Sequence, residues 1–268
     1  MSKITLEHFD NLSNFPEIIN FQTNRFGGFS GEEFKSLNLT YSVGDKPELV
    51  LQNRELLAQT LGIDIHNFVF SHQTHSTNVR IITVKDKGTG VYNSSTSILK
   101  DVDAMITNQS ELMLCMKVAD CLPILFYDPT KKVIGIVHAG WKGTANGITR
   151  KCIETMSEHY GCSTSDIVIG IGVGAGMCCY EVGADVFELL KQSIKNYPNQ
   201  DFYRLGENNK YSIDLKLINK IQLLSMGVDP KKIEIKAECT ICNNDKYFSV
   251  RAKKGSNTGR IACGIMLK

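Results

Sequence analysis

Three residues that lie far apart in the chain, His75, Cys121 and His138, together have the chemistry of a metal pocket. His75 lies in the polar segment SHQTHS, Cys121 in VADCLP and His138 in VHAGWKGT. Imidazole nitrogen and thiolate sulfur both suit zinc, and three protein ligands leave the fourth tetrahedral position free for water or substrate. Because an open position is typical of a catalytic metal, we expect an active site here.

The same residues also suit catalysis without a metal. Cys121 could act as a nucleophile that His138 or His75 activates, with Asp120 as the orienting acid. The two hypotheses differ in whether the Cys121 thiolate is permanently bound to a metal or free to attack a substrate. His72 is a rival ligand, since it lies three residues before His75. The residue pattern alone leaves these alternatives open.

The elements that must position these residues are short apolar runs, whose length and branched residues are typical of strands. They cover 67–71, 79–84, 112–118, 122–127 and 133–138. Asp128-Pro129 is a turn signal between the last two runs, so we expect these two strands to form a hairpin or to lie close together. That arrangement brings Cys121 near His138.

Helices are predicted after the glycine-containing turn AGWKGTANG, at 148–160, and again at 184–194 and 214–226. Gly227 follows the last of these, as a left-handed helix cap would. VIGIGV and residues 259–267 are predicted as further strands, and 91–100 as an exposed loop. Because strands come in clusters, the pattern favours an α/β fold with a mixed sheet flanked by helices, in a single domain over 1–268.

Two other features carry weaker signals. Lys142 lies in a turn where a helix begins, and backbone N–H groups together with a lysine form a natural phosphate site. Cys239 and Cys242 form one C-x-x-C pair without a partner pair, which is poor evidence for structural zinc. Cys178 and Cys179 are adjacent, a spacing poorly suited to chelating one metal. We expect these four cysteines to be ordinary packed or rim thiols.

Charge and composition limit the class of partner. The chain has 30 basic and 28 acidic side chains, a net charge of +2, which predicts a small-molecule substrate rather than nucleic acid. Nine cysteines and an N-terminal segment without an apolar core indicate reduced thiols in a cytoplasm. No run approaches the roughly 18 apolar residues of a membrane span, so no membrane partner is expected. The sequence does not fix the oligomeric state.

An ordered series of motifs runs from about Arg25 to the C-terminus. It comprises FGGFSGEEFKSLNL, VGDKPELVLQNR, QTHS, DVDAMIT, VADCLPILFYDP, GIVHAGWKGT, CCYEVG, DLKLINKIQLLSMGV, ECT, YFSVR and TGRI. In these motifs the chain closely resembles the YfiH or laccase-domain family. That family is named for polyphenol oxidation, and its members are assigned as purine nucleoside phosphorylases with adenosine deaminase activity. The chain departs from the family pattern at 172–177, where GVGAGM replaces a run that usually contains proline.

The resemblance implies a site, a fold and an activity. It places the family's zinc ligands on His75, Cys121 and His138, and so demotes His72. It implies an α/β sandwich related to the catalytic fold of the cytotoxic necrotizing factors. The implied activity is zinc-dependent phosphorolysis of adenosine, inosine and S-methyl-5'-thioadenosine, together with adenosine deamination, with copper as another possible metal. The partners would be a purine nucleoside and phosphate.

Within this scheme, basic residues hold the phosphate, and the candidates are Arg54, Lys142 and Arg251, the last of these in the YFSVR motif. Asp120, next to a predicted ligand, is the candidate for proton transfer.

Three other classes remain open. One is a cysteine-type amidase that edits amino-acid-bearing peptidoglycan precursors, another is a copper-dependent polyphenol oxidase, and the third is a metal-binding module without activity. Copper oxidases generally use several histidine-rich sites, whereas this chain has six histidines in all.

Overall fold

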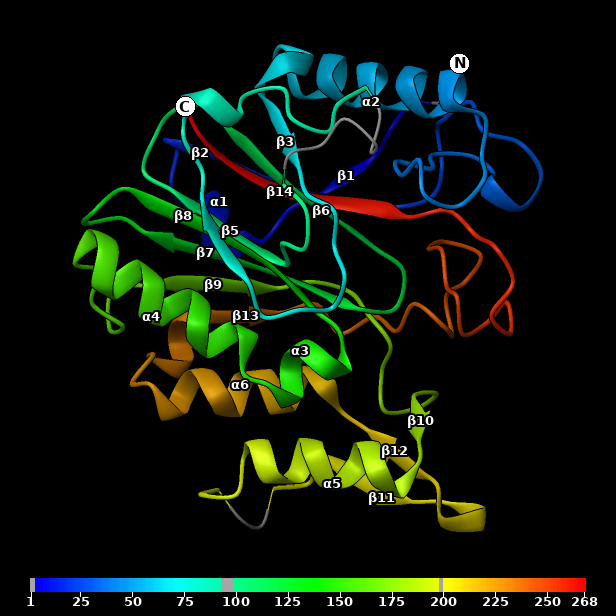
Figure 1. The fold of residues 1–268 in the computed structure, drawn as a ribbon, viewed down its shortest axis with the longest axis vertical. Coiled ribbons are helices and arrows are strands. Elements are labelled where there is room, and N and C mark those ends of the chain that lie inside the picture. The colour runs from blue at the N-terminus through cyan, green and yellow to red at the C-terminus, as the bar shows by residue number, and fades with distance from the viewer. Residues whose placement is uncertain (1–2, 93–98, 198–199) are drawn as a thin grey trace.

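The fold, seen in a computed structural model that describes residues 3–92, 99–197 and 200–268, is a layered α/β sandwich. Two mixed sheets lie face to face at its centre (Figure 1). Helix α2 (Pro47–Leu61) covers the outer face of one sheet. Helices α4 (Ile148–Tyr160) and α6 (Leu215–Ser225) cover the outer face of the other. The predicted class, a mixed-sheet sandwich flanked by helices, is therefore confirmed.

The five-stranded sheet has the order β1-β2-β14-β6-β3. These strands are β1 (Leu6–Glu7), β2 (Ile18–Thr23), β14 (Ile261–Leu267), β6 (Met113–Val118) and β3 (Phe68–Phe70). All neighbours are antiparallel except β3 and β6, which are parallel. Strand β14 lies between β2 and β6, and it falls within the predicted final strand at 259–267.

The six-stranded sheet has the order β13-β9-β7-β8-β5-β4. These strands are β13 (Ile233–Ile235), β9 (Val168–Ile171), β7 (Leu122–Asp128), β8 (Val133–Ala139), β5 (Ala104–Thr107) and β4 (Val79–Ile81). The predicted hairpin is confirmed, because β7 and β8 pair antiparallel with Pro123 opposite His138. The sheet is mixed, since β13 pairs with β9 and β4 with β5 in parallel.

Alternation along β7 explains why its sequence is apolar throughout. Leu122, Ile124 and Phe126 pack in the core beneath α4 and α6. Leu125 and Tyr127 point to the opposite face and pack in the core between the two sheets. Successive side chains of a strand point to opposite faces, and a strand covered on both faces needs apolar residues at every position. The hairpin that contains His138 and directly follows Cys121 is therefore buried at the centre of the fold.

The predicted helices are present with close to their predicted bounds. Helix α4 spans 148–160 and ends at Gly161, a left-handed cap with φ 69°. The N-cap of α6 is Asp214, whose carboxylate accepts a hydrogen bond from Leu217 N at 2.9 Å. The predicted glycine turn after β8 contains a short helix, α3 (Trp141–Ala145).

Other described segments form smaller elements. A three-stranded antiparallel sheet of β10 (Glu181–Val182), β12 (Tyr211–Ile213) and β11 (Tyr203–Leu205) lies beside α5 (Ala184–Ser193), at the bottom of Figure 1. The short helices are α1 (Asp10–Ser13) and the 3-10 turns Glu32–Phe34, Ile65–Asn67, Val84–Asp86, Glu207–Asn209 and Pro230–Lys232.

Two sequence expectations need correction. The strand predicted at 79–84 ends at Ile81, because Thr83 and Asp86 form a capping box that starts a 3-10 turn. In the loop predicted at 91–100, residues 93–98 lie outside the described part of the chain. Tyr92 and Lys100 are exposed as predicted, whereas Val91 and Leu99 are buried.

No helix in the described ranges is both long and apolar enough to cross a membrane. The assignment of one domain to 1–268 stays a prediction.

Candidate active site

The β7–β8 hairpin and the loop after β3 bring the three predicted ligands together. Cys121 directly precedes β7, His138 lies near the end of β8, and His75 lies between β3 and β4. Cys121 Sγ is 3.6 Å from His75 Nε2, and the two imidazole ring centroids are 4.9 Å apart. One ligand atom from each residue lies within 4.8 Å of the others. His72, the rival from the sequence, pairs with Lys100 in a β-bridge and is not part of this group.

Asp103 organises this group, and sequence reasoning missed it. The buried carboxylate accepts a hydrogen bond from His138 Nδ1 at 2.7 Å. It also accepts from the backbone N–H groups of His75 and Ser76, at 3.1 and 2.8 Å. A carboxylate on one imidazole nitrogen fixes the ring and leaves the other nitrogen for a metal or a thiol. Its signal in the sequence was the family-like motif DVDAMIT, in which it is the second aspartate.

The electrostatics of the group favour charge separation between sulfur and imidazole. Burial alone would raise the pKa of Cys121, but the charge and hydrogen bond of His138, with help from His75, lower it to about 6. Burial would lower the pKa of His138, but the Cys121 charge and the Asp103 hydrogen bond raise it to about 9. Without a metal, these opposite shifts of the two pKa values favour a Cys121 thiolate beside a His138 imidazolium. A preformed thiolate is also the species that a metal binds.

The backbone around the group is shaped for close approach. A Cβ atom on Gly140 would lie 2.8 Å from His75 Cδ2 and 2.9 Å from Cys121 Sγ, so only glycine fits there. His75 and Asp120 have left-handed backbones, with φ of 64° and 81°. Such strained conformations concentrate at functional sites. One thiolate and two imidazoles, held together by a glycine that leaves room for them, fit a metal ion.

A cavity of about 680 Å³ opens onto the group, and His75, Cys121 and His138 all line it. This volume is in the range of small-molecule sites. Its wall is basic and aromatic: Arg54, Lys117, Arg251, Lys254 and Arg260 line it together with Tyr41, Phe70 and Tyr180. The arrangement suits a ligand that combines an anion with an apolar ring.

Of the three predicted phosphate residues, Arg54 is buried in the cavity wall. Its guanidinium donates to the backbone carbonyls of Leu39, Gly90 and Val91, which take four of its five N–H groups. It also stacks over the Phe70 ring at 3.9 Å. Burial lowers its pKa to about 10, so it remains charged at neutral pH. Arg54 thus brings positive charge to the wall but has little hydrogen-bonding capacity left for a ligand.

Arg251 and Lys142 lie in different places. Arg251 lines the cavity, donates from Nη1 to Glu181 O at 2.7 Å and lies over the Tyr180 ring. Lys142 is exposed on α3, with its ammonium over the Trp141 ring at 5.6 Å. The described residues that line the cavity do not include Lys142. The structure therefore groups Arg251 and Arg54 with the ligands but leaves Lys142 outside.

Lys117 is a cavity residue that sequence reasoning missed. Its Nζ donates to Ser71 O at 2.6 Å, and it lies near Phe70 on the cavity wall. Burial, with a contribution from the Arg54 charge, lowers its pKa to about 7. The sequence did not predict this role, because a lysine inside an apolar strand is usually interpreted as a residue on the exposed face of the strand.

Asp120 lies beside the group but does not orient its histidines. Its carboxylate accepts from Thr240 Oγ1 at 2.7 Å and from Arg251 N at 2.8 Å. It also lines the cavity, so proton transfer to a ligand stays a prediction. The acid that holds His138, which the metal-free hypothesis assigned to Asp120, is Asp103.

Comparison with known proteins identifies the family to which the chain belongs. The family model described as multi-copper polyphenol oxidoreductase laccase matches residues 19–268. The chain belongs to this family. A purine nucleoside phosphorylase of Bacteroides thetaiotaomicron is 34% identical over 97% of this chain and 95% of its own length. A protein named adenosine deaminase RL5, from an unknown prokaryotic organism, is 31% identical over 99% of this chain and all of its own.

Among solved structures, the Bacillus licheniformis protein YfiH has the same fold, with a TM-score of 0.91 and 33% identity over all of this chain and 97% of that one. Because relatives that match nearly the full length carry enzyme names, this laccase-family chain is an enzyme. The family and the His-Cys-His group together indicate a metal.

Proposed function

We propose that this enzyme is a zinc-dependent purine nucleoside phosphorylase. It would cleave adenosine, inosine and S-methyl-5'-thioadenosine with phosphate, and would also deaminate adenosine. The observation that carries the proposal is the position of the His75, Cys121 and His138 group at the wall of a basic, aromatic cavity. The names of the full-length relatives support both activities. The partners are then a nucleoside and phosphate, in a cytoplasm, with no nucleic acid or membrane.

Zinc is the metal that we assign to the group. Three protein ligands of nitrogen and sulfur leave one position open, as catalytic zinc sites do. When bound, zinc would act as a Lewis acid and make hydroxide available near neutral pH. Asp103 would hold the His138 ring in the tautomer that presents its second nitrogen.

In phosphorolysis, a phosphate oxygen forms a bond to the ribose C1' while the bond from C1' to the purine nitrogen breaks. The products are the free base, which takes up a proton, and ribose 1-phosphate. Arg251, Lys117 and Arg260 on the cavity wall would attract the phosphate anion and hold it against the sugar. Tyr180, also on the wall, offers an apolar surface against which a purine could stack.

In deamination, water adds to C6 of the adenine ring and ammonia leaves, which converts adenosine to inosine. Asp120 is our candidate for moving the proton between water and the leaving nitrogen, because its carboxylate lines the cavity beside Cys121. Its two hydrogen bonds, from Thr240 and Arg251, hold the carboxylate in place.

The deciding experiment is adenosine turnover by the purified protein, with and without phosphate and with and without a strong chelator. Adenine, inosine and ribose 1-phosphate would be resolved. We expect adenine and ribose 1-phosphate only with phosphate, inosine without it, and neither product after chelation. Turnover that survives chelation and dialysis would rule out the metal, and no purine product under any condition would rule out the proposal.

One specific observation favours a second candidate, a cysteine-type amidase acting on amino-acid-bearing peptidoglycan precursors. Cys121, His138 and Asp103 form a nucleophile, base and acid in contact, with the Cys121 pKa lowered to about 6. Such an enzyme would lose activity on thiol alkylation yet keep it after chelation. A copper-dependent polyphenol oxidase, the activity in the family description, would require copper and oxygen instead.

A further inference from the structure

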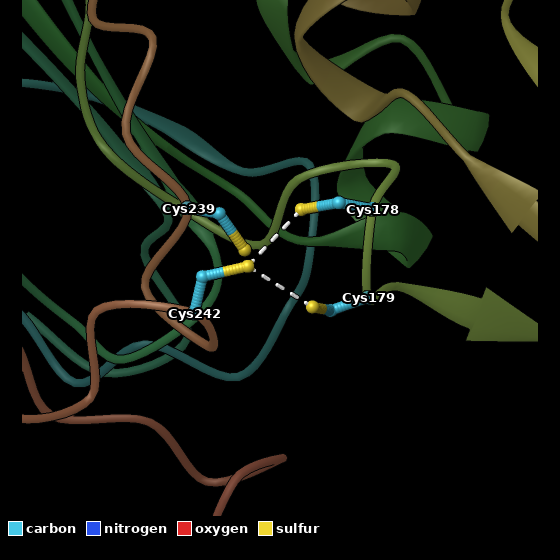
Figure 2. A group of neighbouring side chains, drawn as sticks. All are labelled: Cys178, Cys179, Cys239 and Cys242. Atoms are coloured by element: carbon cyan, nitrogen blue, oxygen red, sulfur yellow. Dashed lines mark hydrogen bonds between the residues drawn. The ribbon is translucent and has the colours of Figure 1, made fainter.

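Four cysteines that the proposed activity does not use converge at one point on the surface. They are Cys178, Cys179, Cys239 and Cys242, and their sulfur atoms all lie within 4.8 Å of one another. Figure 2 shows the four side chains pointing toward a common centre from two separate loops. Cys242 Sγ is 3.3 Å from Cys178 Sγ and 3.2 Å from Cys179 Sγ. These distances exceed a disulfide bond of about 2.05 Å, and all nine cysteines of the chain are free thiols.

The sequence predicted two unrelated pairs of packed or rim thiols, whereas the structure brings all four cysteines together. Cys178 and Cys242 are exposed, so packing does not explain their positions. The adjacent pair can act together because Cys179 N and Tyr180 N both donate to Gly176 O, which closes a turn around the pair. In a strand, neighbouring side chains would point to opposite faces, whereas this turn directs both sulfurs toward Cys242.

We propose that the four cysteines bind a structural zinc ion, separate from the His75, Cys121 and His138 group. In a tetrahedral site with zinc–sulfur bonds of about 2.3 Å, the sulfurs lie about 3.8 Å apart. The two distances from Cys242 Sγ are shorter, 3.3 and 3.2 Å, and all four sulfurs lie within 4.8 Å of one another, so small side-chain rotations would bring them to that spacing. Four thiolates complete the coordination and leave no open position, as in structural zinc sites. On binding, the four thiols would release their protons.

The backbone around the cluster supports a metal site, because it places N–H groups on one sulfur and brings the two loops close together. Gly176 N donates to Cys239 Sγ at 3.2 Å, and the N–H groups of Ile241 and Cys242 also donate to this sulfur. A Cβ atom on Gly176 would lie 3.1 Å from Cys239 Cβ and 3.3 Å from Cys178 Sγ, so a glycine gives the two loops room to meet. Gly174 and Cys239 also form a β-bridge between these loops.

A positive charge lies next to the cluster. Zinc with four thiolates carries a net charge of −2, which a nearby cation would offset. The buried Lys216 donates to Lys236 O and Glu238 O, at 2.6 and 2.8 Å, just before Cys239 in the chain. It is close enough to interact electrostatically with Cys239 and Cys178.

The cluster would fix one wall of the substrate cavity. Thr240, between the two cysteines of the C-x-x-C pair, donates to Asp120, and Ala175 N donates to Asp120 O. Tyr180, on the cavity wall, directly follows the adjacent cysteine pair. A metal that joins the two loops would therefore hold both in register around Asp120.

The test is the zinc content of the protein after gel filtration, measured by mass spectrometry of the metal. The Cys239→Ser/Cys242→Ser double variant should hold about one zinc ion per chain fewer than the wild type. Cys162→Ser, a matched change at a cysteine outside both groups, should not lose zinc. Cys121→Ser counts the other centre separately, so loss of that metal would not be mistaken for loss of this one.

Equal zinc content in the wild type and the double variant would overturn the proposal. So would iron in place of zinc, or an intact mass showing a disulfide between these cysteines in freshly purified protein.

If the double variant does not fold, the wild type still gives an answer. The exposed Cys178 and Cys242 should react slowly with an alkylating reagent before chelation and rapidly after it. Equal rates before and after chelation would overturn the proposal.

Discussion

The described part of the chain contains two clusters of possible metal ligands, which differ in their ligands, their supporting elements and their surroundings. The His75, Cys121 and His138 group lies at the end of the β7–β8 hairpin and in the loop after β3. It is held by the buried Asp103 and opens onto a cavity. The four-cysteine cluster joins two loops at the surface, and none of its members lines that cavity. Three mixed ligands beside a cavity suit catalysis, whereas four thiolates suit structure. Ligand number and setting, rather than residue type alone, thus separate the two proposed roles.

The largest expected effect comes from removing the Cys121 thiolate, which tests whether the first group is the catalytic one. Cys121→Ala should lower adenosine phosphorolysis by at least about 1,000-fold, because a bound metal supplies several kcal/mol of charge stabilisation. The four-cysteine cluster should keep its metal. Steady-state kinetics and metal analysis on the same sample check both. A Cys121→Ala protein with normal turnover would move the chemistry away from this group.

A smaller but cleaner effect should come from Gly140→Ala, which changes no ligand. The new Cβ would lie within 3 Å of both His75 and Cys121, so these ligands must move apart. A displacement of about 1 Å at a catalytic group costs about 100-fold in rate, and we expect a loss of that order. Gly31→Ala is the matched control, since nothing lies within 4 Å of a Cβ there. Equal activity of the two variants would contradict the proposed crowding.

Asp103→Asn should weaken metal binding rather than abolish it. The amide keeps the shape of the carboxylate but loses the charge that supports His138. Partners of metal ligands of this kind are worth about 10- to 100-fold in affinity or activity. Competition with a coloured chelator would measure the change in metal affinity. An unchanged affinity would reduce Asp103 to a purely structural role in the loop at 74–76.

The smallest expected effect is a pH dependence of the KM for phosphate that arises from Lys117. Burial lowers the pKa of Lys117 to about 7, so Lys117 is charged below this pH and neutral above it. We expect the KM for phosphate to rise about tenfold as the pH increases from about 6 to about 9, which corresponds to about 1.4 kcal/mol. Lys117→Met should flatten this dependence.

Lys142→Met removes the predicted phosphate lysine that does not line the cavity. This variant should leave the KM for phosphate unchanged. A larger effect at Lys142 than at Lys117 would favour the phosphate site that the sequence predicted over the one that the structure suggests.

The sequence predicted best those features that depend on local pattern. The β7–β8 hairpin and α4 follow from apolar runs and turn signals, and the hairpin in turn brought Cys121 near His138. Helix α2 was missed because its buried face carries Asn53 and Arg54, which interrupt the apolar pattern. Arg54 itself is bound to carbonyls at positions 39, 90 and 91, partners that no spacing rule could reveal.

The other features that the sequence did not predict share one cause, which is that they depend on residues far apart in the chain lying close together in the fold. Asp103 gains its role only because it lies next to residues 28 and 35 positions away. The four cysteines were judged as two separate pairs, although about 60 residues of sequence fold back to join them. Residue type can suggest candidates, but only the fold decides which of them meet.

The position of β14 has a consequence for how the chain is made. This strand is inserted between β2 and β6, which are synthesised about 240 and 140 residues earlier. Until residues 261–267 leave the ribosome, both neighbours keep an unpaired edge, and such edges are templates for association with other chains. The nascent protein therefore carries an incomplete central sheet through most of its synthesis. We expect it to depend on chaperones at that stage far more than the finished protein does.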